Sequence, residues 1–244
     1  MRRKKLPVKL PAFVQGHHHG VPVVLLHGLG ESWRTFEMVL LHLPNSVRAH
    51  AVTLRGHGEA RGPAGGPADM AADVVAYLDA QLIDEAVLVG HAAGARVAER
   101  VAADAPERVL GLLLAGAAAG QREPEASLTD PKHVAALDAM RAEPPVDRSA
   151  IRVPTLLAWG EEDALVPRAD QEALLREIPR AHLKTYPGVG HAVHREHPAR
   201  FAAHVATIAA VAVAEAHAQA TTLAPPTDAQ LAFFQSYFDK LAAR

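Results

Sequence analysis

One short stretch near the middle of the chain constrains the fold more than any other. An apolar run gives way at once to small residues and then to a helical pattern, in the segment Val87-Leu88-Val89-Gly90-His91-Ala92-Ala93-Gly94-Ala95. This change predicts a strand, a sharp turn and a helix. Gly90 and Gly94 have the G-x-S-x-G spacing of a nucleophile elbow, in which glycines permit a strained turn that presents one side chain above a sheet. The side chain presented here is the methyl group of Ala92, so the surroundings of a nucleophilic serine are present without the serine.

Apolar runs and helical periodicity alternate along most of the chain. Strands are predicted at 21–26, 47–54, 87–90, 109–114, 154–159 and 181–186. Helices are predicted at about 32–43, 69–82, 168–178 and 198–218, with a further helix directly after the elbow. Residues 6–20 contain Pro7, Pro11 and Gly16, which limit them to an edge strand or hairpin. This alternation predicts an α/β fold with a doubly wound, mostly parallel sheet and helices on both faces.

A chain of 244 residues fits one large α/β domain, which we expect to span residues 1–218. Residues 117–150 break the rhythm, with one helix expected at 132–141, and are interpreted as a small cap over the top edge of the sheet. Residues 219–244 are expected to form a linker and an amphipathic helix, whose apolar positions are Leu231, Phe234, Phe238 and Leu241. Such a stripe must be covered by its own domain, by a second copy in a homodimer, or by lying over the mouth of the site.

Composition excludes several classes of function. The formal charge of −2 gives no reason to expect nucleic acid or an anionic membrane as a partner. The absence of cysteine excludes disulfides, thiolate metal sites and a cysteine nucleophile. The basic run 2–5 has no long apolar segment behind it, so we expect a solvated terminus, not a signal or an anchor, and a cytoplasmic protein. The triplet 17–19 of histidines is interpreted as a polar turn, because adjacent side chains on an extended chain point apart.

Chain order identifies candidates for acyl-transfer chemistry. A serine mechanism needs a nucleophile, a histidine, a carboxylate and two backbone N–H donors, and doubly wound hydrolases carry nucleophile, acid and histidine in that order. Here the elbow residue Ala92 is followed by Asp163, after the strand at 154–159, and by His191, after the strand at 181–186. Loops that leave parallel strands at the same sheet edge bring such side chains together. Glu161 and Glu162 flank Asp163 and are alternative acids.

Five motifs in this order resemble those of the α/β-hydrolase fold, in the superfamily of esterases, lactonases and C–C hydrolases, over about residues 21–207. They are His27-Gly28-Leu29-Gly30, Arg55-Gly56-His57-Gly58, the elbow, Trp159-Gly160-Glu161-Glu162-Asp163 with Pro167, and Gly190-His191 with Glu196 and Pro198. The resemblance implies Asp163 as the acid that orients the base, His191 as general base, and the N–H groups of Leu29 and Ala93 as oxyanion hole. It also implies that no cofactor is needed, and it places His57 and His91 beside the site but outside the triad.

Metal binding is not expected. His194 and His197 follow His191 at a spacing typical of one helix face, but no acidic or cysteine ligand set near them completes a site.

Ala92 departs from the family pattern, and three explanations are open. The first is an engineered replacement of serine, so that a ligand stays bound without turnover; the Gly-His pair before Ala92 favours serine as the parent residue. The second is a natural ligand-binding protein that kept the pocket. The third is a serine-independent enzyme in which the His191/Asp163 dyad abstracts a substrate proton. We expect the first: a hydrolase of small carboxylic esters or lactones in a form inactivated at Ala92.

Overall fold

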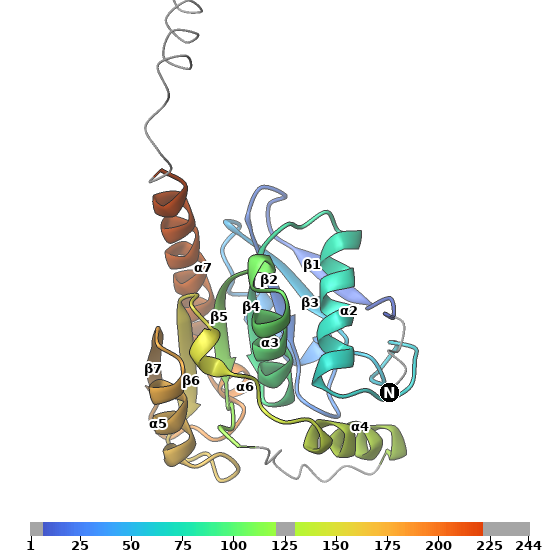
Figure 1. The fold of residues 1–244 in the computed structure, drawn as a ribbon. Helices are drawn as coiled ribbons and strands as arrows, with labels where there is room; N and C mark the ends of the chain where they lie inside the picture. The colour runs from blue at the N-terminus through green and yellow to red at the C-terminus, as the bar shows by residue number, and fades with distance from the viewer. Residues whose placement is uncertain (1–6, 121–129, 222–244) are drawn as a thin grey trace, which may run out of the picture. The chain divides into compact units, whose positions relative to one another are not determined.

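A computed structural model describes residues 7–120 and 130–221, and its strands form one seven-stranded sheet in the order β1-β3-β2-β4-β5-β6-β7 (Figure 1). The strands are β1 (Ala12–Gln15), β2 (Val21–Leu26), β3 (Val47–Val52), β4 (Ala86–His91), β5 (Val109–Ala115), β6 (Thr155–Gly160) and β7 (Ala181–Tyr186). β1 pairs antiparallel with β3, and all other neighbours are parallel. The predicted doubly wound, mostly parallel sheet is confirmed, with the proline-bounded β1 at its edge.

Helices cover both faces of the sheet. They are α1 (Glu37–Leu40), α2 (Pro67–Ala80), α3 (Ala93–Asp104), α4 (Pro131–Ala142), α5 (Arg168–Glu177), α6 (Val193–Glu196) and α7 (Pro198–Thr221), with short 3-10 turns at Trp33–Phe36, Pro106–Arg108 and Arg148–Ala150. α2 and α3 lie side by side over one face (Figure 1).

Alternate strand residues serve two separate cores. On β4, Leu88 packs into the core that contains side chains of α2, α3 and α5, whereas Val87 and Val89 pack into the core that contains side chains of α1 and α7. Successive side chains of a strand point to opposite faces, so a sheet covered on both sides needs apolar residues at every position. This is why the strands appear in the sequence as unbroken apolar runs.

The predicted helix at 32–43 is wrong in extent. A 3-10 turn, Trp33–Phe36, precedes the single α-helical turn of α1. Ser32 does cap the segment, since its side chain accepts a hydrogen bond from the N–H of Arg34, but the N–H of Trp33 is drawn to Thr53 Oγ1 at 3.3 Å. That contact ties the first turn to the end of β3. Leu41 is 73% exposed, so the apolar residues beyond residue 40 do not form a continuous face that packs on the core.

The histidine triplet lies in a turn, as predicted, but its geometry differs from our expectation. The ring centroids of His17, His18 and His19 lie 3.8–5.5 Å apart. The rings gather because the backbone turns here and is not extended.

The chain divides into two compact units, residues 1–213 and 214–244. The cap helix expected at 132–141 is α4, which begins after its N-cap Asp130, and residues 121–129 of the cap lie outside the described part.

Within the described chain, residues 198–218 of α7 are long and apolar enough to cross a membrane, with mean hydropathy 1.4. Phe201, Val205 and Ile208 of this helix are buried in the domain core, which accounts for its apolar face. The predicted aromatic helix near the C-terminus lies outside the described residues.

Candidate active site

The elbow is formed as the sequence predicts. Ala92 lies between β4 and α3 with φ 48° and ψ −115°, a conformation that L-residues rarely adopt. A Cβ on Gly94 would overlap the carbonyl oxygen of Leu26, and one on Gly90 would overlap the backbone at Ala95. The two glycines are therefore required by close backbone packing around the turn, not by a positive φ of their own.

The predicted acid and histidine are hydrogen-bonded to each other. His191 Nδ1 lies 2.8 Å from Asp163 Oδ2, while Asp163 Oδ1 accepts hydrogen bonds from the N–H groups of Leu165 and Val166 at 2.8 and 2.9 Å. Burial alone would raise the pKa of Asp163, but the bond with His191 and these two donors outweigh it and hold the pKa below its ordinary value. An ionised Asp163 accepts from Nδ1–H, so the lone pair of His191 is on Nε2. Glu161 and Glu162 are exposed, and the carboxylate that bonds to His191 is that of Asp163.

Two contacts place His191 beside the elbow. The N–H of Ala92 donates to the carbonyl of Ala115 at 2.9 Å, and the next residue, Gly116, lies under the imidazole: a Cβ on Gly116 would come within 2.8 Å of His191 Cε1. The His191 side chain remains 17% exposed. The end of β5 thus joins Ala92 to His191, and the imidazole is accessible to a ligand.

The loop after β2 lies against the elbow. A Cβ on Gly28 would lie 3.6 Å from Ala92 Cβ, which puts this loop against the elbow. Among the described residues, no hydrogen bond uses the N–H of Leu29, and Ala93 begins α3, so its N–H has no partner within the helix. Two N–H donors are therefore available at the positions that the resemblance implies.

His27 holds this loop in place. Its Nδ1 donates to the carbonyl of Gly28 at 2.7 Å, and its Nε2 accepts from the N–H of Leu54 at 3.0 Å. Burial and the nearby His57 lower the pKa of His27 to about 3. The neutral ring is the form that fits, since a proton on Nε2 would face the Leu54 N–H.

Further histidines surround this centre: His57 and His91 lie beside it, as the resemblance implies, whereas His133 was not predicted there. His57 stacks on His133 of the cap helix α4, with ring centroids 4.7 Å apart and planes 15° apart. His91 lies next to His191 and His194, at 4.9 and 4.3 Å between centroids. No short-range sequence pattern connects His57 with His133, which lies on α4, or His91 with His194, which lies on α6.

Glu31 was also missed. The sequence shows no acidic ligand close to His194 along the chain, but the fold brings Glu31 next to it. Within the described chain, Glu31, His91 and His194 are the one group whose positions suit a metal ion. Burial would raise the pKa of Glu31, but His91, His194 and the N–H of Gly28 lower it far below its usual range, whereas burial lowers that of His194.

Comparisons with known proteins agree with this geometry. Residues 23–148 match the model of the alpha/beta hydrolase family, and residues 134–198 match that of the serine aminopeptidases S33. Esterase YbfF of Escherichia coli (strain K12) is 35% identical over 96 residues, which are 39% of this chain and 38% of that protein. The chain thus aligns with well under half the length of this curated relative.

Solved structures resemble the chain over most of its length. A thermophilic esterase from Thermogutta terrifontis superposes with a TM-score of 0.74 at 24% identity, covering 83% of this chain and 93% of its own. Est816, described as an N-acyl homoserine lactone degrading enzyme, superposes with a TM-score of 0.66 at 26% identity, covering 81% of this chain and 96% of its own.

Proposed function

Because this chain belongs to the α/β-hydrolase family, we propose that its site is that of a hydrolase of small carboxylic esters or lactones in which Ala92 replaces the nucleophilic serine. The observation that carries the proposal is the combination of a strained elbow at Ala92 with a complete Asp163–His191 hydrogen bond. The esterase and lactone-degrading relatives support the substrate class.

With serine at position 92, the chemistry follows from the geometry. The hydroxyl would lose its proton to His191 Nε2 as its oxygen attacks the ester carbonyl, and Asp163 would hold the imidazolium. The N–H groups of Leu29 and Ala93 would donate to the oxyanion. His191 would then return the proton to the leaving alcohol, and water would hydrolyse the acyl-enzyme. With Ala92 the binding groups remain but no covalent step is available.

The test is hydrolysis of p-nitrophenyl acetate and of an N-acyl homoserine lactone by this chain and by Ala92→Ser. We expect the serine variant to gain about 10³-fold or more in kcat/KM, because triad members act as a unit. Ala95→Ser, which adds a hydroxyl three positions along in the buried start of α3, is the matched control and should gain nothing. Adding His191→Ala to Ala92→Ser should remove the gain. A serine variant as inactive as the control would refute the proposal and favour ligand binding as the function.

A second candidate is favoured by one observation: the Asp163–His191 pair is fully formed although no hydroxyl stands before it. Such a dyad abstracts a proton from a substrate directly. This reading predicts that the chain is already active with Ala92 and that His191→Ala abolishes the activity, whereas the hydrolase reading predicts an inactive chain. The same panel therefore separates the two.

A further inference from the structure

Three segments that form the candidate active site also meet behind it, in a cluster that the hydrolase chemistry does not use. Glu31 lies on the loop after β2, His91 ends β4 immediately before Ala92, and His194 lies on α6, three residues after His191. One ligand atom from each lies within 4.8 Å of the other two. Two imidazoles and a carboxylate are a ligand set that zinc commonly takes in proteins.

Three of the four imidazole nitrogens of this cluster have no hydrogen-bond partner among the described residues. Among the described residues, both nitrogens of His91 and Nδ1 of His194 are buried and form no hydrogen bond. His91 is 4% exposed and His194 0%. A buried polar atom without a partner costs about 1–3 kcal/mol. One nitrogen of each ring is therefore free to bind an ion, and His91 Nδ1 is the one that lies near the Glu31 carboxylate.

The separation of the nearest pair suits a shared ion better than a direct bond. His91 Nδ1 lies 3.5 Å from Glu31 Oε2, longer than an ordinary N–H···O hydrogen bond. Ligands about 2.0–2.1 Å from a tetrahedral zinc ion lie roughly 3.3–3.5 Å from each other. This pair is already at that spacing, and the other ligand atoms lie at most 4.8 Å apart.

Neighbouring groups already orient the ligands. Thr35 Oγ1 lies 2.9 Å from His194 Nε2 and donates to Glu31 Oε1 at 3.2 Å, while Glu31 Oε2 accepts from the N–H of Gly28. Contacts of this kind fix the ring orientation and tautomer of metal-binding histidines.

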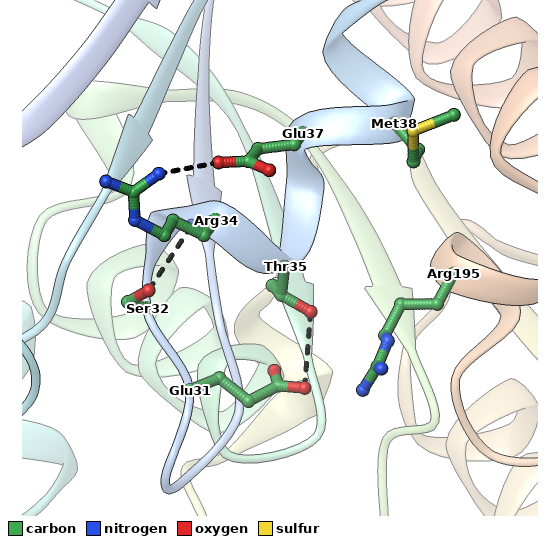
Figure 2. Close-up of a pocket in the computed structure, with 7 residues that line it drawn as sticks. All are labelled: Glu31, Ser32, Arg34, Thr35, Glu37, Met38 and Arg195. Atoms are coloured by element: carbon green, nitrogen blue, oxygen red, sulfur yellow. Dashed lines mark hydrogen bonds and ion pairs between the residues drawn. The ribbon is translucent and has the colours of Figure 1, made fainter.

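An entry path leads to the cluster. Glu31 and Thr35 line a pocket of about 400 Å³, bounded on the opposite side by Arg195 (Figure 2). The Glu31 carboxylate points toward Thr35 in this view and is 23% exposed, so an ion can approach from solvent.

We propose that Glu31, His91 and His194 bind one divalent metal ion of the zinc type. This ion would join the loop after β2, the end of β4 and helix α6. The proposal does not depend on turnover at Ala92. The proposed role of the metal ion is structural: it holds together the three segments that set the geometry of the candidate active site.

The binding experiment uses the full chain with His17, His18 and His19 replaced by serine, because these exposed imidazoles would bind metal themselves. Zn²⁺ is titrated by calorimetry, and Co²⁺ by the visible absorption of its tetrahedral complexes. We expect one ion per chain and a melting temperature that rises with metal concentration, since an ion that binds only the folded state stabilises it. Failure to bind one ion per chain would overturn the proposal.

Variants then assign the ligands. Glu31→Gln keeps the size of a partly exposed side chain and should lower the affinity at least 100-fold, and Thr35→Val, which removes an orienting group, should lower it about 10–100-fold. His204→Gln is the control and should bind as the parent does, because His204 pairs with Tyr186 of the edge strand β7 and not with the cluster. Circular dichroism verifies that each variant is folded. A folded Glu31→Gln variant with unchanged affinity would show that the ion binds elsewhere and would refute the site.

Discussion

Ala92 has the backbone conformation of a nucleophile elbow but carries no nucleophilic group. Its φ of 48° and ψ of −115° belong to a conformation that costs roughly 1–3 kcal/mol and persists only where the surroundings enforce it. In a serine enzyme that strain presents a nucleophile, but here it presents a methyl group. The strain therefore remains in a chain that obtains no covalent chemistry from it.

We predict that Ala92→Gly stabilises the protein. Glycine relieves the strain at a positive φ, and the gain is reduced by about 0.4–1 kcal/mol because glycine also frees the unfolded chain. The expected net rise in the free energy of unfolding is about 1 kcal/mol, measured by urea denaturation. Ala105→Gly, at the end of α3 with φ −143°, is the control and should be neutral or destabilising. A loss of stability in both variants would show that the elbow is unstrained.

At the scale of elements, the packing of α3 against β2 depends on the absence of a side chain at Gly94. A Cβ on Gly94 would overlap the carbonyl of Leu26 on the neighbouring strand β2, and neither backbone has room to move. We predict that Gly94→Ala lowers the free energy of unfolding by about 3 kcal/mol or more, at the upper end of overpacking costs. In Gly111→Ala the new Cβ would lie 3.2 Å from the Ala212 side chain, so we expect a clearly smaller loss. Equal losses in thermal denaturation would contradict this account.

A buried arginine ties the cap to the sheet. Arg148 pairs with Glu99 of α3 at 2.9 Å, and both side chains are 3% exposed; it also donates to the carbonyls of Ala118 and Ala119, where the chain leaves β5. Arg148→Met leaves the Glu99 carboxylate buried without its partner, which we predict costs about 3–5 kcal/mol.

The second partner of Arg148 supplies the comparison. Glu177 is 47% exposed, so Glu177→Gln should cost less than about 1 kcal/mol. Adding Glu99→Gln to Arg148→Met should recover part of the stability, because the unpaired charge is removed. Urea denaturation of the four proteins measures this coupling, and a double variant less stable than Arg148→Met would rule out the buried charge as the cause.

For the whole molecule, the sequence predicted the features that depend on local periodicity or on the order of residues along the chain. β7 has the predicted bounds, and the elbow, Asp163 and His191 were identified because strand periodicity and chain order carry that information. The apolar spacing at 32–43 did not distinguish a long helix from the 3-10 turn and single α-helical turn that the segment forms. The Glu31 cluster was missed because its members, on the loop after β2, at the end of β4 and on α6, meet only through the order of strands in the sheet.

The buried histidines give the whole molecule a predicted sensitivity to acid. Burial lowers the pKa of His27 to about 3 and that of His50 to about 4, and it also lowers those of His57 and His194. In the unfolded chain these groups titrate near 6.5, so below that pH the unfolded state binds more protons than the folded state does. Their contribution to stability is therefore complete above pH 6.5 and is lost as pH falls toward the folded-state values.

We predict that the free energy of unfolding is level near pH 7.5 and falls from about pH 6.5, before most carboxylates titrate. His27 alone accounts for about 2–3 kcal/mol at pH 4.5, since each pH unit between its two pKa values is worth about 1.4 kcal/mol. Urea denaturation at pH 7.5, 6.5, 5.5 and 4.5 measures the slope. His50→Gln removes one such group and should make the slope shallower between pH 6.5 and 4.5. Stability that stays constant down to pH 4.5 would mean that these histidines are hydrated in the folded protein, because only their burial as neutral rings produces the loss.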